Sequence, residues 1–330
     1  MPYLNRDQIL ALIDKRRIYS NNSSFNNQIQ PASLDLTLSD KCYRIKASFI
    51  PNNIKISKVI KELSLTKIDL NKNTLLEKNC IYLCELNEKL SLPHDIMGKS
   101  NPKSTTGRLD IFTRVITENG KEYDYVNYNY KGKLYLEIIP QSFSIILKKN
   151  LSLNQIRFFQ DSKTKGKIKQ INISVSIKKN EITAYKAKKI TSAIDLSKIN
   201  FYKSEKYWEK IIPRDNYFII ERDEFYILRS KEAIRIKNNQ AAELEPFKDS
   251  FGNFRVHYAG FFDPGFGNNK KGTPAVLELR AYDTPFIIRD GQLVGRLNYY
   301  EIDEIKKKIY GIKIKSNYYN QNLKLAKQFK

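Results

Sequence analysis

One glutamate lies inside an apolar segment near the end of the chain and is suited to acid–base chemistry. Residues 275–279 read Ala-Val-Leu-Glu-Leu, which predicts a buried strand carrying Glu278. A buried carboxylate is costly unless it is paired or used. The strand follows residues 255–267, whose Asp-Pro-Gly tip predicts a tight turn that can approach a ligand closely. We therefore expect a β-hairpin, the Glu278 strand and then a Gly-turned hairpin ending near residue 300; a structural strand with a satisfied glutamate is the alternative.

A second polar cluster, at residues 101–113, has the composition of a phosphate-binding turn. It reads Asn-Pro-Lys-Ser-Thr-Thr-Gly-Arg-Leu-Asp-Ile-Phe-Thr, so that hydroxyl groups lie between Lys103 and Arg108. Hydroxyls, cations and freed backbone N–H groups are what a polyphosphate requires. An ordinary surface turn of mixed polar residues is the alternative for this string taken alone.

The charge of the chain favours anionic partners. Its 330 residues include 58 Lys and Arg against 35 Asp and Glu, a net charge of +23. Nucleic acid is one polyanion that such an excess attracts. The charges are spread along the chain, however, so we expect an anionic small substrate and no nucleic-acid partner. No apolar run approaches 18 residues and no signal sequence begins the chain, which predicts a cytoplasmic protein without a membrane partner.

The cysteines and histidines do not suit a zinc deaminase. The three cysteines, Cys42, Cys80 and Cys84, are sparse and odd in number, as expected of reduced thiols in a cytosol. The histidines, His94 and His257, lie in separate halves of the chain. A zinc deaminase would need a His-x-Glu and a Pro-Cys-x-x-Cys string, and the sequence contains neither.

The chain repeats one plan. Residues 75–93 and 219–237 each combine a turn, alternating apolar positions around a tyrosine, a charged break and a second alternating run. Each half later carries a strand with a carboxylate, Glu137 in the first and Glu278 in the second. Short alternating runs separated by turns predict antiparallel strands. We expect a mainly β protein with two tandem β-barrel domains of the jelly-roll type, residues 1–200 and 201–330.

Three further segments are predicted around these strands. Residues 4–17 read as a short amphipathic helix with Asn5 as its N-cap. Residues 47–73 read as an insert in the first half. Residues 180–215 lack a clear period and read as a connector, with a short strand inside it as the open alternative.

Four motifs occur in the order found in one family. They are Gln-Pro-Ala-Ser-Leu-Asp-Leu at 30–36, the 101–113 string, the Asp-Pro-Gly turn followed by Leu-Glu, and Asp-Gly-Gln-Leu-Val-Gly-Arg-Leu at 290–297. Together they resemble the dCTP deaminases of the dUTPase superfamily, in particular the double-length bacterial form. The resemblance implies dUTPase-like domains, a homo-oligomer, with a trimer favoured, and deamination of dCTP to dUTP and ammonia for thymidylate synthesis. It also implies Mg²⁺ bound to the triphosphate, no zinc, and dTTP as a further possible ligand.

The resemblance also implies roles for particular residues. A glutamate activates water, a serine and an arginine position it and stabilise developing charge, and the remaining residues hold the nucleotide. The catalytic residues would be Glu278, Ser104 and Arg108, with Glu137 as the alternative base; the substrate-binding residues would be Lys103, Thr105, Ala259, Asp263, Gly265, Tyr318 and Gln321.

Departures from the family pattern divide these roles between the halves. The second half lacks the serine and arginine in its matching stretch, 247–253, and the first half lacks the Asp-Pro-Gly turn, having the longer 117–125. Phe261 replaces a basic residue of the single-length enzymes. We therefore expect each half to keep one contribution, which favours Glu278 over Glu137 as the base. A dUTPase or a bifunctional deaminase and diphosphatase, and a non-enzymatic nucleic-acid-binding β-barrel, are the alternatives.

Overall fold

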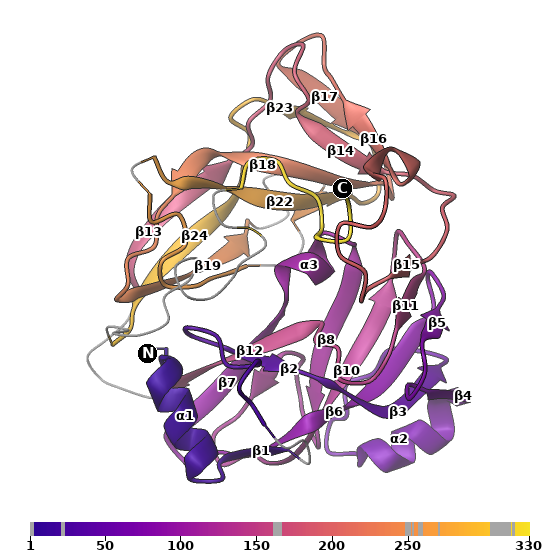
Figure 1. The fold of residues 1–330 in the computed structure, drawn as a ribbon, viewed down its shortest axis with the longest axis vertical. Helices are drawn as coiled ribbons and strands as arrows, with labels where there is room; N and C mark the ends of the chain where they lie inside the picture. Colours follow the sequence, from indigo (N-terminus) through magenta and orange to yellow (C-terminus); the bar gives the residue numbers. More distant parts are fainter. Residues whose placement is uncertain are drawn as a thin grey trace. The chain divides into compact units, whose positions relative to one another are not determined.

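The protein is mainly β and consists of two compact units (Figure 1). The computed structural model describes residues 3–20, 24–160, 167–247, 252, 254–256, 260–269, 271–303, 318 and 321–330. The first unit comprises Met1–Lys165 with Ser192–Lys198, and the second comprises Gly166–Thr191 with Ile199–Lys330. The units thus differ from the single division at residue 200 predicted from sequence, because each takes a segment from the region where we expected only a connector.

Short helices lie among the strands of the described residues. They are α1 (Arg6–Asp14), α2 (Ile56–Leu63), α3 (Ser104–Gly107) and the 3₁₀ helix η1 (Ser204–Lys206). The predicted N-terminal helix is α1, and Asn5 caps it: the Asn5 side chain accepts from the Gln8 N–H at 3.0 Å while the Gln8 side chain accepts from the Asn5 N–H at 2.9 Å. Within the described ranges, no helix has the length and apolar character needed to cross a membrane.

The described strands of the first unit form three sheets. Their strand orders are β4-β3-β6-β10-β8 with β1 beside β6, β2-β12-β7-β9, and β15-β11-β5. The strands are β1 (Ile18–Ser20), β2 (Leu34–Leu36), β3 (Leu38–Ile45), β4 (Ser64–Asp69), β5 (Thr74–Leu76), β6 (Ile81–Ser91), β7 (Ile96–Pro102), β8 (Ile111–Thr117), β9 (Tyr125–Val126), β10 (Lys131–Pro140), β11 (Ile145–Leu147), β12 (Asn154–Gln160) and β15 (Ile194–Asp195).

The second unit repeats this arrangement. Its sheets have the orders β16-β14-β18-β22-β20, β13-β24-β19-β21 and β17-β23. The strands are β13 (Lys167–Ser174), β14 (Ala184–Ala187), β16 (Trp208–Ile211), β17 (Tyr217–Ile220), β18 (Phe225–Ile234), β19 (Gln240–Pro246), β20 (Phe254–Val256), β21 (Phe261–Phe262), β22 (Thr273–Ala281), β23 (Phe286–Arg289) and β24 (Leu293–Glu301). In chain order, the strands of the second unit correspond to β2–β12 of the first: β13 corresponds to β2, β14 to β3, and β16–β24 to β4–β12.

Side-chain contacts repeat as well. The Tyr82 hydroxyl accepts from the Glu77 N–H at 2.9 Å, and the Tyr226 hydroxyl accepts from the Glu221 N–H at 3.0 Å. In the first unit Glu88 accepts from the Thr37 N–H and hydroxyl at 2.9 and 2.6 Å. In the second, Glu232 accepts from the N–H and hydroxyl of Ser174 at 2.8 and 2.6 Å. The predicted repeat is therefore present down to individual hydrogen bonds.

Two local predictions were wrong. The region 180–215 contains β14 and β16, which belong to the second unit's large sheet, and β15. Residues 286–301 do not form a Gly-turned hairpin, because β23 pairs with β17 while β24 pairs with β13 and β19. In both cases each strand's partner is distant in sequence, so local patterns carry no record of the pairing.

The thiol prediction also needs correction. The pairing of β3 with β6 places Cys42 directly opposite Cys84, and the two form a disulfide. The sequence predicted reduced thiols because sparse cysteines are typical of a cytosol. Cys80 is free.

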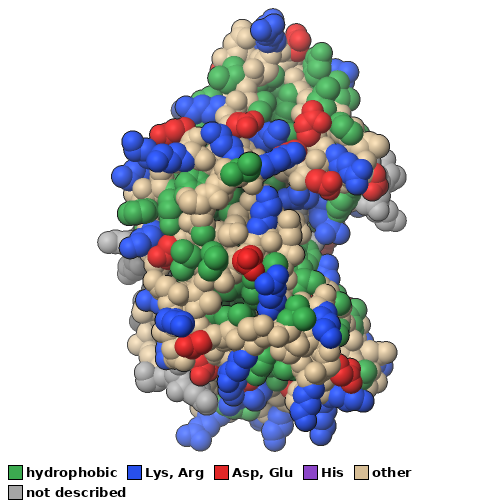
Figure 2. Space-filling model, turned by 90° about the vertical axis from the view of Figure 1, so that its right-hand side faces the viewer, with side chains coloured by type: hydrophobic (Ala, Val, Ile, Leu, Met, Phe, Trp, Pro, Cys, Tyr) green, Lys and Arg blue, Asp and Glu red, His purple; other side chains and the backbone are tan. Residues whose placement is uncertain are grey.

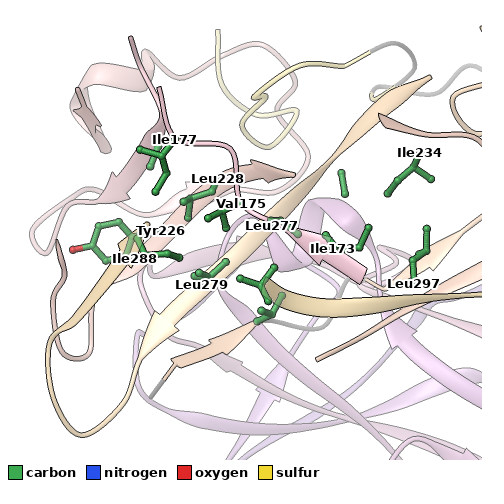
Figure 3. Packing of buried hydrophobic residues seen from close by; sticks show 14 of the residues in the cluster. Ile173, Val175, Ile177, Tyr226, Leu228, Ile234, Leu277, Leu279, Ile288 and Leu297 are labelled. Atoms are coloured by element: carbon green, nitrogen blue, oxygen red, sulfur yellow. The ribbon is translucent and has the colours of Figure 1, made fainter. Parts of the chain in front are cut away.

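The core of the second unit lies between its two large sheets. Leu277 and Leu279 of β22 pack with residues of β13, β18 and β24 (Figure 3). These residues are the apolar positions of alternating strands, which point to one face of a sheet. The same alternation turns the residues between them, Glu278 included, to the opposite face.

Candidate functional site

Glu278 is buried although it points away from the core of its unit. It lies on β22 opposite Ile227 of β18, and only 2% of its surface is exposed. Its neighbours Leu277 and Leu279 face the core. Since strand alternation excludes Glu278 from that core, other segments must cover it. The non-core face of β22 is therefore where this carboxylate is shielded from water.

The C-terminal tail is one of the segments that reach β22. The Gln321 side-chain amide donates to the Pro274 carbonyl at 3.4 Å, and Arg229 donates to the Asn322 side chain at 2.6 Å. Arg229 pairs with Val276 in the sheet, two residues from Glu278. Tyr318, also predicted as a substrate-binding residue, is buried, and its hydroxyl accepts from the Lys327 N–H at 3.2 Å. The structure thus brings Gln321 to the strand that carries Glu278.

The Asp-Pro-Gly tip forms the predicted turn. The Phe266 N–H donates to the Asp263 carbonyl at 3.1 Å, and Gly265 has a φ of 91°, as the third position of a type II turn requires. The Gly265 N–H donates to the Ile236 carbonyl at 3.1 Å, which ties the turn to the segment after β18. Asp263 is half-buried in this turn. Ala259 lies outside the described residues.

The phosphate-type residues gather on one short element of the first unit. Lys103 precedes α3, Ser104 and Thr105 begin it, and Arg108 follows it. The Thr106 hydroxyl donates to the Leu153 carbonyl at 2.7 Å and holds α3 against the start of β12. Ser104 is half-buried, whereas Arg108 is only 3% exposed. Two hydroxyl groups and two cationic side chains therefore lie on α3 or directly beside it.

Asp35 supports this cluster and was not singled out from the sequence. Its carboxylate accepts from the Lys103 ammonium and, at 3.2 Å, from the Gln30 side-chain amide. Asp35 is 5% exposed, and its other oxygen has no hydrogen-bond partner among the described residues. The available signal was a carboxylate between the two leucines of β2, the same pattern that drew attention to Glu278. Asp35 orients the cation that we expect to meet phosphate.

Glu137 occupies the matching strand of the first unit. It lies on β10 opposite Arg114 of β8 and is fully buried. Burial raises the pKa of Glu137, and the Ser48 side chain and the Arg114 guanidinium lower it only in part. The guanidinium stacks on the Tyr123 ring at 4.4 Å.

The first unit's insert covers the face on which Glu137 lies. Ile56 and neighbouring apolar residues of the insert pack against Tyr135, which is two residues from Glu137 on the same face. The Glu118 carboxylate accepts from the Tyr135 hydroxyl at 2.8 Å and from the Ile56 N–H at 3.4 Å, joining the insert to the sheet. Apolar insert residues therefore pack near Glu137, beside the Arg114 guanidinium, whereas polar tail residues reach the strand of Glu278.

No three His, Cys, Asp or Glu side chains come together in an arrangement that could hold a metal ion in the described part of the chain. On the face drawn in Figure 2, Lys and Arg side chains lie scattered among acidic and uncharged ones. That distribution differs from the continuous basic stripe typical of nucleic-acid-binding surfaces.

Comparison with known proteins adds the family. The model of the 2'-deoxycytidine 5'-triphosphate deaminase N-terminal domain matches residues 2–162, and that of the C-terminal domain matches residues 144–329. The chain is also similar to the crystal structure of 2'-deoxycytidine 5'-triphosphate deaminase from Agrobacterium tumefaciens. Over 91% of this chain and 99% of that one, the identity is 38% and the TM-score 0.87.

Two archaeal relatives match about half of the chain. A dUMP-forming dCTP deaminase from Methanococcus maripaludis is 27% identical over 173 residues, which is 47% of this chain and 80% of the relative. A probable deoxyuridine 5'-triphosphate nucleotidohydrolase from Archaeoglobus fulgidus is 28% identical over 171 residues, 50% of this chain and 93% of the relative. Both relatives thus have about the length of one unit.

Proposed function

The chain belongs to the dCTP deaminase family, and we propose that it hydrolyses dCTP to dUTP and ammonia with Glu278 as the general base. The observation that carries this proposal is that one chain contains both motif sets. The first is the hydroxyl and cation cluster around α3, and the second is the Asp-Pro-Gly turn that precedes a strand with a buried glutamate. The first suits a triphosphate and the second suits a nucleoside.

The proposed chemistry needs one proton carrier. Glu278 takes a proton from water, and the resulting hydroxide attacks C4 of cytosine. Glu278 passes that proton to N3, then takes the proton of the new C4 hydroxyl and delivers it to the amino group, which departs as ammonia as the C4=O bond forms and the C4–N bond breaks. Ser104 and Arg108 position the water and the amino group and stabilise the charge that develops in the transition state.

The remaining predicted residues would bind the nucleotide. Lys103 and Thr105 meet the phosphates, which arrive as the Mg²⁺ complex of dCTP. Asp263 and Gly265 hold the deoxyribose, the Ala259 carbonyl holds the water, and Tyr318 and Gln321 cover the substrate. The two motif sets lie on different units of the chain, and we propose that each contributes to nucleotide binding. We further propose that each unit closes as a jelly-roll-like barrel, that the protein forms homotrimers in the cytoplasm, and that dTTP competes for the site.

Product analysis tests the proposal directly. Purified protein incubated with Mg²⁺ and dCTP should release ammonia and dUTP in equal amounts, and 1,10-phenanthroline should leave the rate unchanged. Loss of activity that added zinc restores would refute the zinc-free mechanism. Absence of ammonia would refute the deaminase assignment itself.

Hydrolysis of dUTP to dUMP is the second candidate activity. It is favoured by the names of the two archaeal relatives, one described as dUMP-forming and the other as a probable dUTP nucleotidohydrolase. The same incubation separates the outcomes: dUMP and pyrophosphate would indicate a bifunctional enzyme, and hydrolysis of added dUTP without ammonia from dCTP would indicate a dUTPase.

A further inference from the structure

The two units differ at one sheet edge. In the first unit β11 lies between two strands: β5 on one side and, on the other, β15, which pairs with it in parallel through Ile145 and Ile194. The matching strand of the second unit is β23, and β17 is its antiparallel partner. Among the described strands none pairs with the other edge of β23. Among its described residues, the second unit therefore leaves open an edge that the first unit covers with a strand.

The β17–β23 ribbon also has an apolar face turned to solvent. Phe218 and Ile288 point inward and are buried. Ile219 and Ile287 lie directly opposite each other on the outer face, and they are 52% and 38% exposed. Tyr217, 38% exposed, continues this row. Figure 1 shows the two strands beside β14 and β16 of the same unit.

An open edge with an apolar face favours pairing with another strand. An edge strand presents unpaired N–H and C=O groups, and proteins commonly cover such edges. A ribbon of two strands is marginally stable, whereas four strands with an apolar face are much more stable. The strand β15 shows how this protein covers the equivalent edge in its first unit.

We propose that β23 pairs antiparallel with β23 of a second copy of this chain, around a two-fold axis through Ile287. The result is a four-stranded sheet in which Ile219 and Ile287 of both copies form one apolar row. A two-fold contact requires a self-complementary surface, and this edge meets that requirement. With Ile287 opposite its own copy, the two Arg289 side chains lie at opposite ends of the contact, so like charges do not meet.

Sedimentation velocity over a range of protein concentrations tests the contact without nucleotide, so the result is independent of the deaminase assignment. The wild-type protein should reach a species of twice the mass of the largest species formed by Ile287→Asp. The matched control is Leu75→Asp, because Leu75 is the repeat equivalent of Ile219 and is 49% exposed. Leu75→Asp should associate as the wild type does. Equal masses for the wild type and Ile287→Asp at every concentration, or the same loss in both variants, would overturn the proposal.

Disulfide trapping supplies a second test that does not depend on destabilising the ribbon. Directly opposite residues of antiparallel strands have Cα atoms about 4.5–5.5 Å apart, within the range that a disulfide bridges. Oxidised Ile287→Cys should therefore give a covalent dimer on denaturing gels. The wild type and Leu75→Cys should give none. A variant that stays monomeric on these gels while it associates in solution would exclude this register.

Discussion

At the scale of single residues, Glu137 and Glu278 stand on equivalent strands but have different surroundings. Apolar insert residues pack on the face of Glu137, whereas polar tail residues reach the strand of Glu278. A general base must come within hydrogen-bond reach of its water in the substrate complex. We therefore predict that Glu278→Gln abolishes deamination and leaves dCTP binding largely intact, because the amide keeps the shape of the carboxyl group.

Glu137→Gln is the matched control. Burial already raises the pKa of the Glu137 carboxyl group, and the substitution makes this group permanently neutral. We therefore expect little change in turnover and an effect mainly on stability or assembly. Turnover and dCTP affinity, measured for both variants, decide between the glutamates. An inactive Glu137→Gln beside an active Glu278→Gln would move the catalytic site to the first unit.

Ser104 and Arg108 should contribute mainly to turnover. We predict that Ser104→Ala and Arg108→Ala each lower kcat by about 10²–10³-fold, the usual effect of removing one preorganised donor. Steady-state kinetics with dCTP check this, with circular dichroism as the control for folding because Arg108 is buried. If KM rises while kcat stays near the wild-type value, the two residues bind phosphate and take no part in the chemical step.

At the scale of structural elements, the Asp-Pro-Gly turn depends on glycine at a second position. Gly267 has a φ of 63°, and a Cβ atom there would lie 2.1 Å from the Ile234 carbonyl oxygen. We predict that Gly267→Ala lowers the free energy of unfolding by about 1–3 kcal/mol or more, and weakens dCTP binding because the turn must move. Gly291→Ala is the control: its φ is 78°, but the contact nearest its added Cβ is the Lys231 ammonium at 3.9 Å.

Chemical denaturation of both variants gives the comparison. Gly291→Ala carries backbone strain without a backbone clash. Its free energy of unfolding should therefore fall less than that of Gly267→Ala, and its dCTP affinity should be retained. Equal losses in the two variants would mean that positive φ alone matters and that the Gly267 contact with Ile234 relaxes freely.

The segment before β9 contains a carboxyl group that should make stability depend on pH. Burial raises the pKa of Asp124 from 3.8 to about 6, although its carboxylate accepts from the Ser100 hydroxyl at 2.6 Å and the Val115 N–H at 2.8 Å. The folded state therefore holds this proton more tightly than the unfolded state. Its contribution to stability is present below about pH 4 and is lost as the pH rises to about 6.

Asp124→Asn removes this titration and keeps an oxygen for both donors. We predict that the variant gains thermal stability relative to the wild type as the pH rises from about 4 to 6, with no further gain above that range. Thermal unfolding across this interval measures the difference. A difference that stays constant with pH would show that Asp124 does not titrate there.

The sequence predicted the elements whose signals are local. Alternating apolar residues predicted most of the strands, Asn5 marked the start of α1, and Pro264 with Gly265 marked a turn. The repeat predicted two similar units. Strand partners are set by contacts between distant segments, so the sheet that includes β14 and β16 was missed.

The candidate site was likewise predictable where its signals are local in sequence, and not where it depends on contacts between distant segments. Motifs placed Lys103, Ser104 and Arg108 on one element, and the structure keeps them there. The Asp35–Lys103 ion pair joins residues 68 positions apart, and the two meet because β12 pairs with β2 on one side and with β7, which ends next to Lys103, on the other. Likewise, nothing local indicates that Cys42 lies opposite Cys84.

At the scale of the whole molecule, the duplication has left the two units with complementary motifs. The first unit keeps the α3 cluster, and the second keeps the Asp-Pro-Gly turn with Glu278. If each complete site needs both, a chain supplies one site and not two.

We predict that titration calorimetry of Glu278→Gln with Mg²⁺ and dCTP gives about one nucleotide bound per chain. The inactive variant is used so that no substrate is consumed. Glu137→Gln combined with Glu278→Gln should give the same stoichiometry. Two nucleotides per chain, falling to one when Arg114 is replaced by alanine to disturb the surroundings of Glu137, would show that the first unit holds a nucleoside site of its own.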